Sequence, residues 1–120
     1  GNKKKEVLGV PLDPNYKLLG GAKLTEDMKV TCSCTATGKD FKQTGFLVLA
    51  EQARGPKIWC ASGLLTMSQF ADTAKNTLHR PMENVFSEKY SMALGKVVVQ
   101  HPGWIKSLPR CIPLHPPANP

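Results

Sequence analysis

Three short strand-like runs, separated by turns, constrain the fold of this chain more than any other feature. Residues 28–34 alternate between apolar and polar positions, residues 45–50 form an apolar run, and residues 57–60 carry Ile and Trp. Turn-forming residues separate them at 37–40 and at 54–56. Because consecutive short strands usually pair with their neighbours, the pattern predicts a small antiparallel sheet.

One helix is marked by a capping box after the third run. Thr66 fits the N-cap position, and Gln69 stands three residues later, where its side chain can bond back to the cap. The apolar positions that follow recur every four residues, at Phe70, Ala74 and Leu78. This spacing predicts a helix over about 67–78 with one apolar face.

The second half of the chain gives weaker signals. Residues 80–86 predict a shorter helix, because a proline at position 81 is tolerated only near a helix start. Residues 90–94 fit a strand or a helix. The three valines at 97–99 are β-branched, which favours a strand there.

A length of 120 residues fits one domain. We expect a basic, proline-containing arm at 1–15, a single domain at 16–108 and a proline-rich, polyproline-like tail at 109–120. No apolar run approaches a membrane span, and no signal peptide is visible, so we expect an intracellular protein with no membrane partner.

The charge balance favours an anionic partner. The chain has 16 Lys and Arg against 9 Asp and Glu, a net charge of +7. Such an excess suits nucleic acid. The alternative is a solvated basic surface that aids solubility, since the cations are scattered along the chain.

A basic helix end is the sequence's candidate for nucleic-acid contact. Lys75 and His79 are four residues apart and share a helix face, and Arg80 follows, with Lys89 a further nearby cation. Asn76 could reach base edges while the cations meet phosphates. The alternative is a solvated helix end, where cations suit the helix dipole.

The cysteines allow a zinc site but favour none. The nearest set of ligands is Cys32, Cys34, Cys60 and His79, and Cys111 with His115 could form half a site. Without a secretory signal and with apolar neighbours, we interpret the cysteines as small core residues with reduced thiols. We therefore expect no metal or other cofactor, with zinc as the alternative.

Catalytic signatures are missing from the sequence. No cysteine has the neighbourhood of a known nucleophile family, no Gly-rich phosphate loop is present, and no pair of carboxylates stands out. We therefore expect a binding protein and not an enzyme. Trp59, in a strand, is expected in the core, whereas Trp104 could stack on a ligand or anchor the tail.

The stretch from 57 to 75 resembles SAND domains and the related plant Tify-domain-binding domains. In these families a strand carrying a Cys leads through a turn to a capped helix that contains a Phe. The matching positions are Cys60, Thr66, Gln69 and Phe70. Residues 30–34 look like the first Cys-bearing strand, and residues 80–84 look like the segment after the helix in the plant branch.

The resemblance covers about residues 24–95 and implies a twisted antiparallel sheet with helices packed on one side. The fold class we expect is thus α+β and SAND-like, with two to four helices. The implied role is DNA or chromatin binding in a nuclear transcription regulator, so double-stranded DNA is the expected partner. SAND domains contact DNA with a Lys-Asp-Trp-Lys motif, where this chain has residues 81–84 instead. The alternative is therefore a module that binds a protein of a chromatin complex without touching DNA.

Overall fold

The computed structural model describes residues 16–36, 38–50, 55–75 and 80–113. Eight strands in this part of the chain belong to one sheet. They are β1 (Tyr16–Leu18), β2 (Lys29–Ala36), β3 (Lys39–Ala50), β4 (Pro56–Cys60), β5 (Gly63–Leu65), β6 (Val85–Ser87), β7 (Met92–Ala93) and β8 (Arg110–Pro113).

Four α-helices and two short 3-10 helices accompany the sheet in the same part of the chain. They are α1 (Met67–Thr73), α2 (Pro81–Asn84), α3 (Leu94–Gln100), α4 (Pro102–Lys106), η1 (Leu19–Gly21) and η2 (Glu26–Met28). The fold class is therefore α+β, as predicted. None of these helices has the length and apolar character needed to cross a bilayer.

The sheet is open and mixed. Its main path runs β1-β8-β3-β2-β6-β7, and β4 lies against β3 and β5 off this path. One pair is parallel, because Leu49 and Ala50 of β3 lie opposite Arg110 and Cys111 of β8. The expectation of a purely antiparallel sheet is wrong at this pair. The chain reaches β8 through α3 and α4, and a connection of that length permits a parallel arrangement that a tight hairpin does not.

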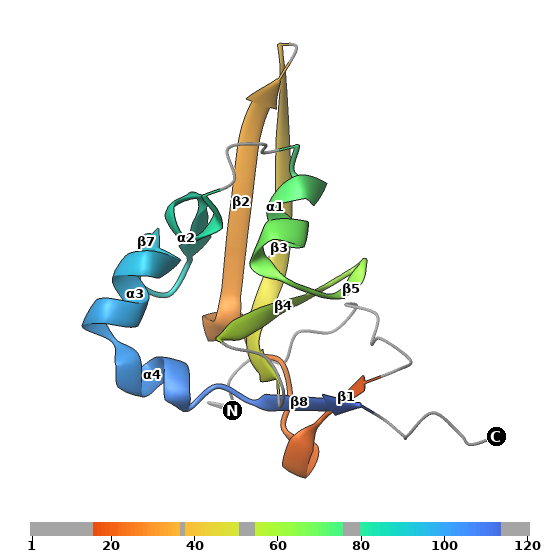
Figure 1. Ribbon diagram of the computed structural model, residues 1–120, viewed down its shortest axis with the longest axis vertical. Helices are drawn as coiled ribbons and strands as arrows, with labels where there is room; N and C mark the ends of the chain where they lie inside the picture. Colours follow the sequence, from red (N-terminus) through yellow and green to blue (C-terminus); the bar gives the residue numbers. More distant parts are fainter. Residues whose placement is uncertain (1–15, 37, 51–54, 76–79, 114–120) are drawn as a thin grey trace, which may run out of the picture.

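The hairpin of β2 and β3 is the longest feature of the molecule (Figure 1). Its register runs from Lys29 opposite Phe46 to Ala36 opposite Lys39. The turn therefore has two residues, and Gly38 within it has a φ of 75°. Two-residue hairpin turns require such positive φ values, which glycine adopts without steric cost. The turn predicted at 37–40 is therefore confirmed in place at Gly38, but its length is wrong, because Lys39 and Asp40 already belong to β3.

The core lies where α1 packs against the sheet. The side chains of Phe70 and Ala74 are fully buried, as the four-residue spacing predicts, and so are those of Ile58 and Trp59 in β4. The capping box is also confirmed: the Gln69 amide N–H donates to the hydroxyl of Thr66, and the Thr66 amide donates to the Gln69 side chain. Two predicted hydrogen bonds thus fix the first turn of the helix.

The predicted length of this helix is wrong. The helix ends at Thr73, and Ala74 is its C-cap. Lys75 then has a φ of 61°, in the left-handed region, where an α-helix cannot continue. Residues 76–79, including the expected apolar position Leu78, lie outside the described residues.

The strand predicted at 97–99 is a helix instead. Leu94 and Val97 are buried three residues apart on one face of α3, whereas Val98 and Val99 are exposed. Burial on a helical period has therefore overridden the β-propensity of the valines. The short helix predicted at 80–86 is confirmed as α2, which begins at Pro81 and gives way to β6 at Val85.

The segment expected to be a polyproline-like tail begins with a strand. Within β8, Cys111 is buried and lies opposite Leu18, and Pro113 lies opposite Tyr16 at the end of the ladder. Proline is tolerated there because this position lies at the end of the strand. The arm at 1–15 and residues 114–120 lie outside the described residues.

Candidate nucleic-acid interface

The outer half of the β2–β3 hairpin extends beyond the rest of the sheet (Figure 1). On the β2 side, pairing with β6 involves only residues 30–32, and on the β3 side, pairing with β4 involves only residues 46–49. Residues 33–36 and 39–43 therefore form a two-stranded ribbon with no third strand among the described ones. We call this segment, residues 33–36 with 39–43, the outer hairpin.

The outer hairpin carries cations on both of its faces. Side chains of a strand alternate between faces, and Gly45 marks the face covered by α1, since a Cβ atom there would point at Phe70. Lys39 and Gln43 share that face, whereas Lys42 lies on the opposite one. All three side chains are exposed.

The face away from α1 is polar. Lys42 lies directly opposite Ser33, and both side chains are exposed. One step nearer the core, Thr31 lies opposite Thr44, and both are half-buried. Asp40 also lies on this face, so the outer hairpin holds an acid beside its cations. A row of hydroxyls beside a lysine provides hydrogen-bond donors that suit phosphate oxygens and base edges.

The end of α1 is fastened to the base of the outer hairpin. The Gln43 side-chain amide donates a hydrogen bond of 3.3 Å to the carbonyl oxygen of Thr73, in the last turn of the helix. Lys75 is exposed two residues later. The structure thus places Lys75, one residue of the predicted helix-end site, two residues after the point where α1 contacts Gln43 of the outer hairpin. Lys39 and Lys42 of the same hairpin are not among the residues predicted from the sequence.

The other residues of the predicted site are more dispersed. Arg80 is the N-cap of α2, and its guanidinium lies 3.9 Å from the carboxylate of Glu83, with both side chains about 70% exposed. Lys89 follows β6, near the start of β2, because the Glu88 amide donates to the carbonyl of Lys29. That is the end of β2 opposite the outer hairpin. The structure therefore does not bring Lys89 together with Lys75, and Asn76 and His79 lie outside the described residues.

Lys89 instead belongs to an aromatic cluster beside α4. The rings of Tyr90 and His101 are stacked with centroids 3.8 Å apart, and Trp104 meets Tyr90 edge-on at 5.2 Å. The Lys89 ammonium lies 5.4 Å from the Tyr90 centroid. Trp104 is therefore an anchor of α4 against this cluster, while Trp59 is a core residue, as predicted.

The described cysteines belong to the core. Cys32, Cys60 and Cys111 are buried and are not part of a disulfide. No group of three metal-ligating side chains occurs among the residues that the structure describes. Of the zinc ligands considered from the sequence, the Cys34 side chain, His79 and His115 lie outside that part. Within the described part of the chain, Cys32 and Cys60 are thiols packed in the hydrophobic core.

Burial controls the chemistry of the Cys60 thiol. Loss of solvent raises its pKa above the ordinary value of 9.0, while hydrogen bonds with Ser62 and Gly63 act in the opposite direction. The thiol donates to the carbonyl of Gly63 at 3.6 Å. A protonated, 4% exposed thiol is a poor nucleophile and a poor metal ligand near neutral pH.

Sequence patterns could have identified the outer hairpin. Lys39 to Thr44 contains five polar side chains around Phe41, and a strand with polar residues on both faces is solvated on both faces. Comparison with protein-family models, curated proteins and solved structures gave no match. The functional assignment therefore rests on the geometry of this surface.

Proposed function

We propose that the domain binds double-stranded DNA, as a non-catalytic module of a nuclear transcription or chromatin regulator. The observation that carries the proposal is the outer hairpin, a projecting two-stranded ribbon with exposed lysines on both faces. The major groove of B-DNA is about 12 Å wide and admits a two-stranded ribbon. A net charge of +7 would draw the domain toward DNA before specific contacts form.

Each part of the surface has a role in this proposal. Lys39 and Lys42 contact phosphates from the two faces of the ribbon, and Ser33 lies directly opposite Lys42 on one of these faces. Lys75 adds a third cation at the base of the ribbon. Arg80 contributes less, because its guanidinium already has Glu83 as a neighbour.

The SAND-like architecture belongs to the same proposal. Its support is the order of a Cys-bearing strand, a capping box and a buried Phe, at Cys60, Thr66 and Phe70. In this proposal the contact surface differs from the resemblance, because it is the outer hairpin and not the segment after the helix.

Fluorescence anisotropy with a labelled duplex tests the function. At about 50 mM salt we expect micromolar or tighter binding. Reversing Lys39 and Lys42 together to Glu should weaken binding at least tenfold, about 1.4 kcal/mol. The pair Lys75→Glu with Arg80→Glu should have a smaller effect.

The matched control reverses two exposed lysines elsewhere, Lys17 and Lys106, and changes the net charge equally. This control should lose much less affinity than the outer-hairpin variant. Equal losses would mean that the net charge alone attracts DNA. Absence of binding by the folded wild-type chain at low salt would favour the alternative, a protein-interaction module without DNA contact.

A further inference from the structure

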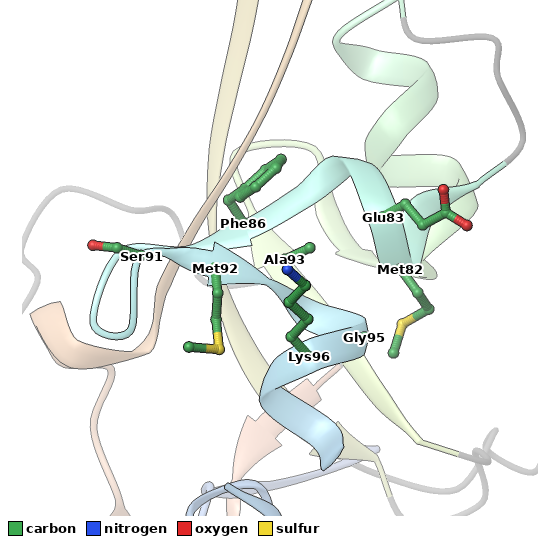
Figure 2. A pocket seen from close by; sticks show the side chains of 8 residues that line it. All are labelled: Met82, Glu83, Phe86, Ser91, Met92, Ala93, Gly95 and Lys96. Carbon is green, nitrogen blue, oxygen red and sulfur yellow. The ribbon is translucent and has the colours of Figure 1, made fainter. Parts of the chain in front are cut away.

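A second surface lies at the edge of the sheet formed by β7. In the order of the strands, β7 and its neighbour β6 are on one side of β2, and β3 is on the other. Here α2, β6, β7 and the first turn of α3 surround a hollow of about 490 Å³ (Figure 2). Met82 comes from α2, Phe86 from β6, Met92 from β7 and Lys96 from α3. We call this feature the α2–α3 hollow.

Close contact between α2 and α3 shapes the hollow. Gly95 lines it, and a Cβ atom on that residue would lie 3.2 Å from the carbonyl oxygen of Met82. The absence of a side chain at this position favours the close approach of the two helices, because a Cβ atom there would crowd the Met82 carbonyl. The methionine side chains of Met82 and Met92 lie on either side of the start of α3 in Figure 2.

Exposed apolar side chains gather around the hollow. Phe86 is 46% exposed, and Val99 is 77% exposed. Val99 is four residues after Gly95, so it lies on the same face of α3 and extends the apolar surface by one helical turn. Apolar side chains gathered around a hollow mark a binding surface more often than scattered ones do.

The charges at the rim favour an acidic ligand. Glu83 lies next to Arg80, at 3.9 Å, so its carboxylate already has a cation. Lys96 is exposed and has no ion-pair partner in the described part of the chain. A carboxylate on a ligand would supply that partner, and the net charge of +7 adds a long-range attraction.

We infer that the α2–α3 hollow docks a short peptide segment of another protein. In this complex a bulky apolar side chain of the peptide enters between Met82 and Met92, and a neighbouring Asp or Glu pairs with Lys96. The flexible thioethers of methionine fit apolar side chains of several shapes. A second copy of this chain is a poor occupant, because two molecules of charge +7 repel each other and each would bring Lys96 to the contact.

Methionine-methyl NMR on the full chain tests this inference. The probes are synthetic peptides of about 12 residues, each with a central Leu, Phe or Trp flanked by Asp and Glu. The chain has four methionines, and two of them are internal controls: Met28 is buried at the base of β2, and Met67 lies on α1. We expect the Met82 and Met92 methyl signals to shift saturably while the control signals stay in place.

Variants make the result specific. Lys96→Glu should weaken peptide binding about tenfold, whereas the matched reversal Lys106→Glu on α4 should leave it nearly unchanged. Peptides with Asn and Gln in place of the acids should bind the wild-type chain more weakly than the acidic peptides do, because Lys96 then has no carboxylate to pair with. DNA titration of Lys96→Glu separates this inference from the proposed function, because Lys96 lies outside the outer hairpin.

Several results would overturn the inference. They are the absence of saturable shifts for every peptide at about 1 mM, shifts at Met28 or Met67 only, and equal effects of the Lys96 and Lys106 reversals. Self-association of the free chain in sedimentation equilibrium, abolished by Met92→Glu, would assign the hollow to a second copy instead.

Discussion

Gly45 is the residue on which the packing of α1 depends most directly. It lies in the middle of β3, opposite Val30 of β2. A Cβ atom at this position would overlap Ile58 Cγ2 and lie 3.1 Å from Phe70 Cε1. Both of these side chains are fully buried. The glycine is therefore needed for close approach of helix and sheet, and not for a turn.

Gly45→Ala should lower the free energy of unfolding by about 1–3 kcal/mol, because the added methyl group overpacks a rigid core. Urea denaturation measures the change. The control is Gly103→Ala in α4, where a Cβ atom would meet no other atom within 4 Å and alanine favours the helix. A Gly45→Ala variant as stable as wild type would contradict the close packing of α1.

The Cys60 thiol has a predictable response to pH. Its pKa in the folded chain is raised above 9.0, so above this pH the unfolded chain ionises first and the folded state loses relative stability. The unfolding free energy should therefore fall more steeply between about pH 8 and about pH 10 in wild type than in Cys60→Ala. Equal slopes would show that Cys60 ionises normally in the folded chain.

At the scale of the element, α1 shows what a local motif determines and what it does not. The capping box correctly predicted the start of the helix, because both of its hydrogen bonds are local to residues 66–69. The end at Thr73 carries no such local signal. The carbonyl of Thr73 accepts a hydrogen bond from the side-chain amide of Gln43, 30 positions away, a contact that no local pattern specifies. Helices often end at a glycine with a left-handed backbone conformation, but here the residue in that conformation is Lys75.

Thr66→Ala should destabilise the domain by about 0.5–2 kcal/mol through loss of the cap. Phe70→Ala should cost about 3–5 kcal/mol, because it leaves a cavity between helix and sheet. Thermal melts measure both effects. Similar small effects of the two variants would mean that α1 contributes little to the core.

Sequence patterns also failed for α3, for a physical reason. The valines at 97–99 have a strong preference for strands, yet the chain gains more by burying Leu94 and Val97 together on one helical face. This gain depends on the surface formed by α2, β6 and β7, which a local pattern cannot include. The exposed Val99 that results belongs to the surface we assign to peptide docking.

At the scale of the whole molecule, the strands of the central sheet were predictable and their assembly was only partly so. The runs at 28–34, 45–50 and 57–60 correspond to parts of β2, β3 and β4, since alternation and turns are local signals. The parallel pair of β3 and β8 joins residues some 60 positions apart along the chain, and no local pattern specifies such a contact.

The candidate site was predictable in part for the same reason. Lys75 was selected from its position on a predicted helix. Lys39 was missed because it fell in the turn predicted at 37–40, and Lys42 because it preceded the strand predicted at 45–50, whereas both belong to β3. The two lysines project from the molecule because β6 and β4 stop pairing before they reach the outer hairpin. Where this pairing stops depends on the assembled sheet and cannot be predicted from the local sequence.

The salt dependence of duplex binding is the most direct test of DNA recognition by the outer hairpin. Wild type and the Lys39→Glu, Lys42→Glu double variant are titrated between about 50 and about 200 mM salt. If both lysines contact phosphates, the logarithm of the wild-type binding constant falls linearly with the logarithm of salt, and the slope of the variant is smaller by about 1.8. Two results together would contradict binding through the outer hairpin. They are equal slopes for wild type and the Lys39→Glu, Lys42→Glu variant, and a larger change of slope for the control variant with Lys17 and Lys106 reversed.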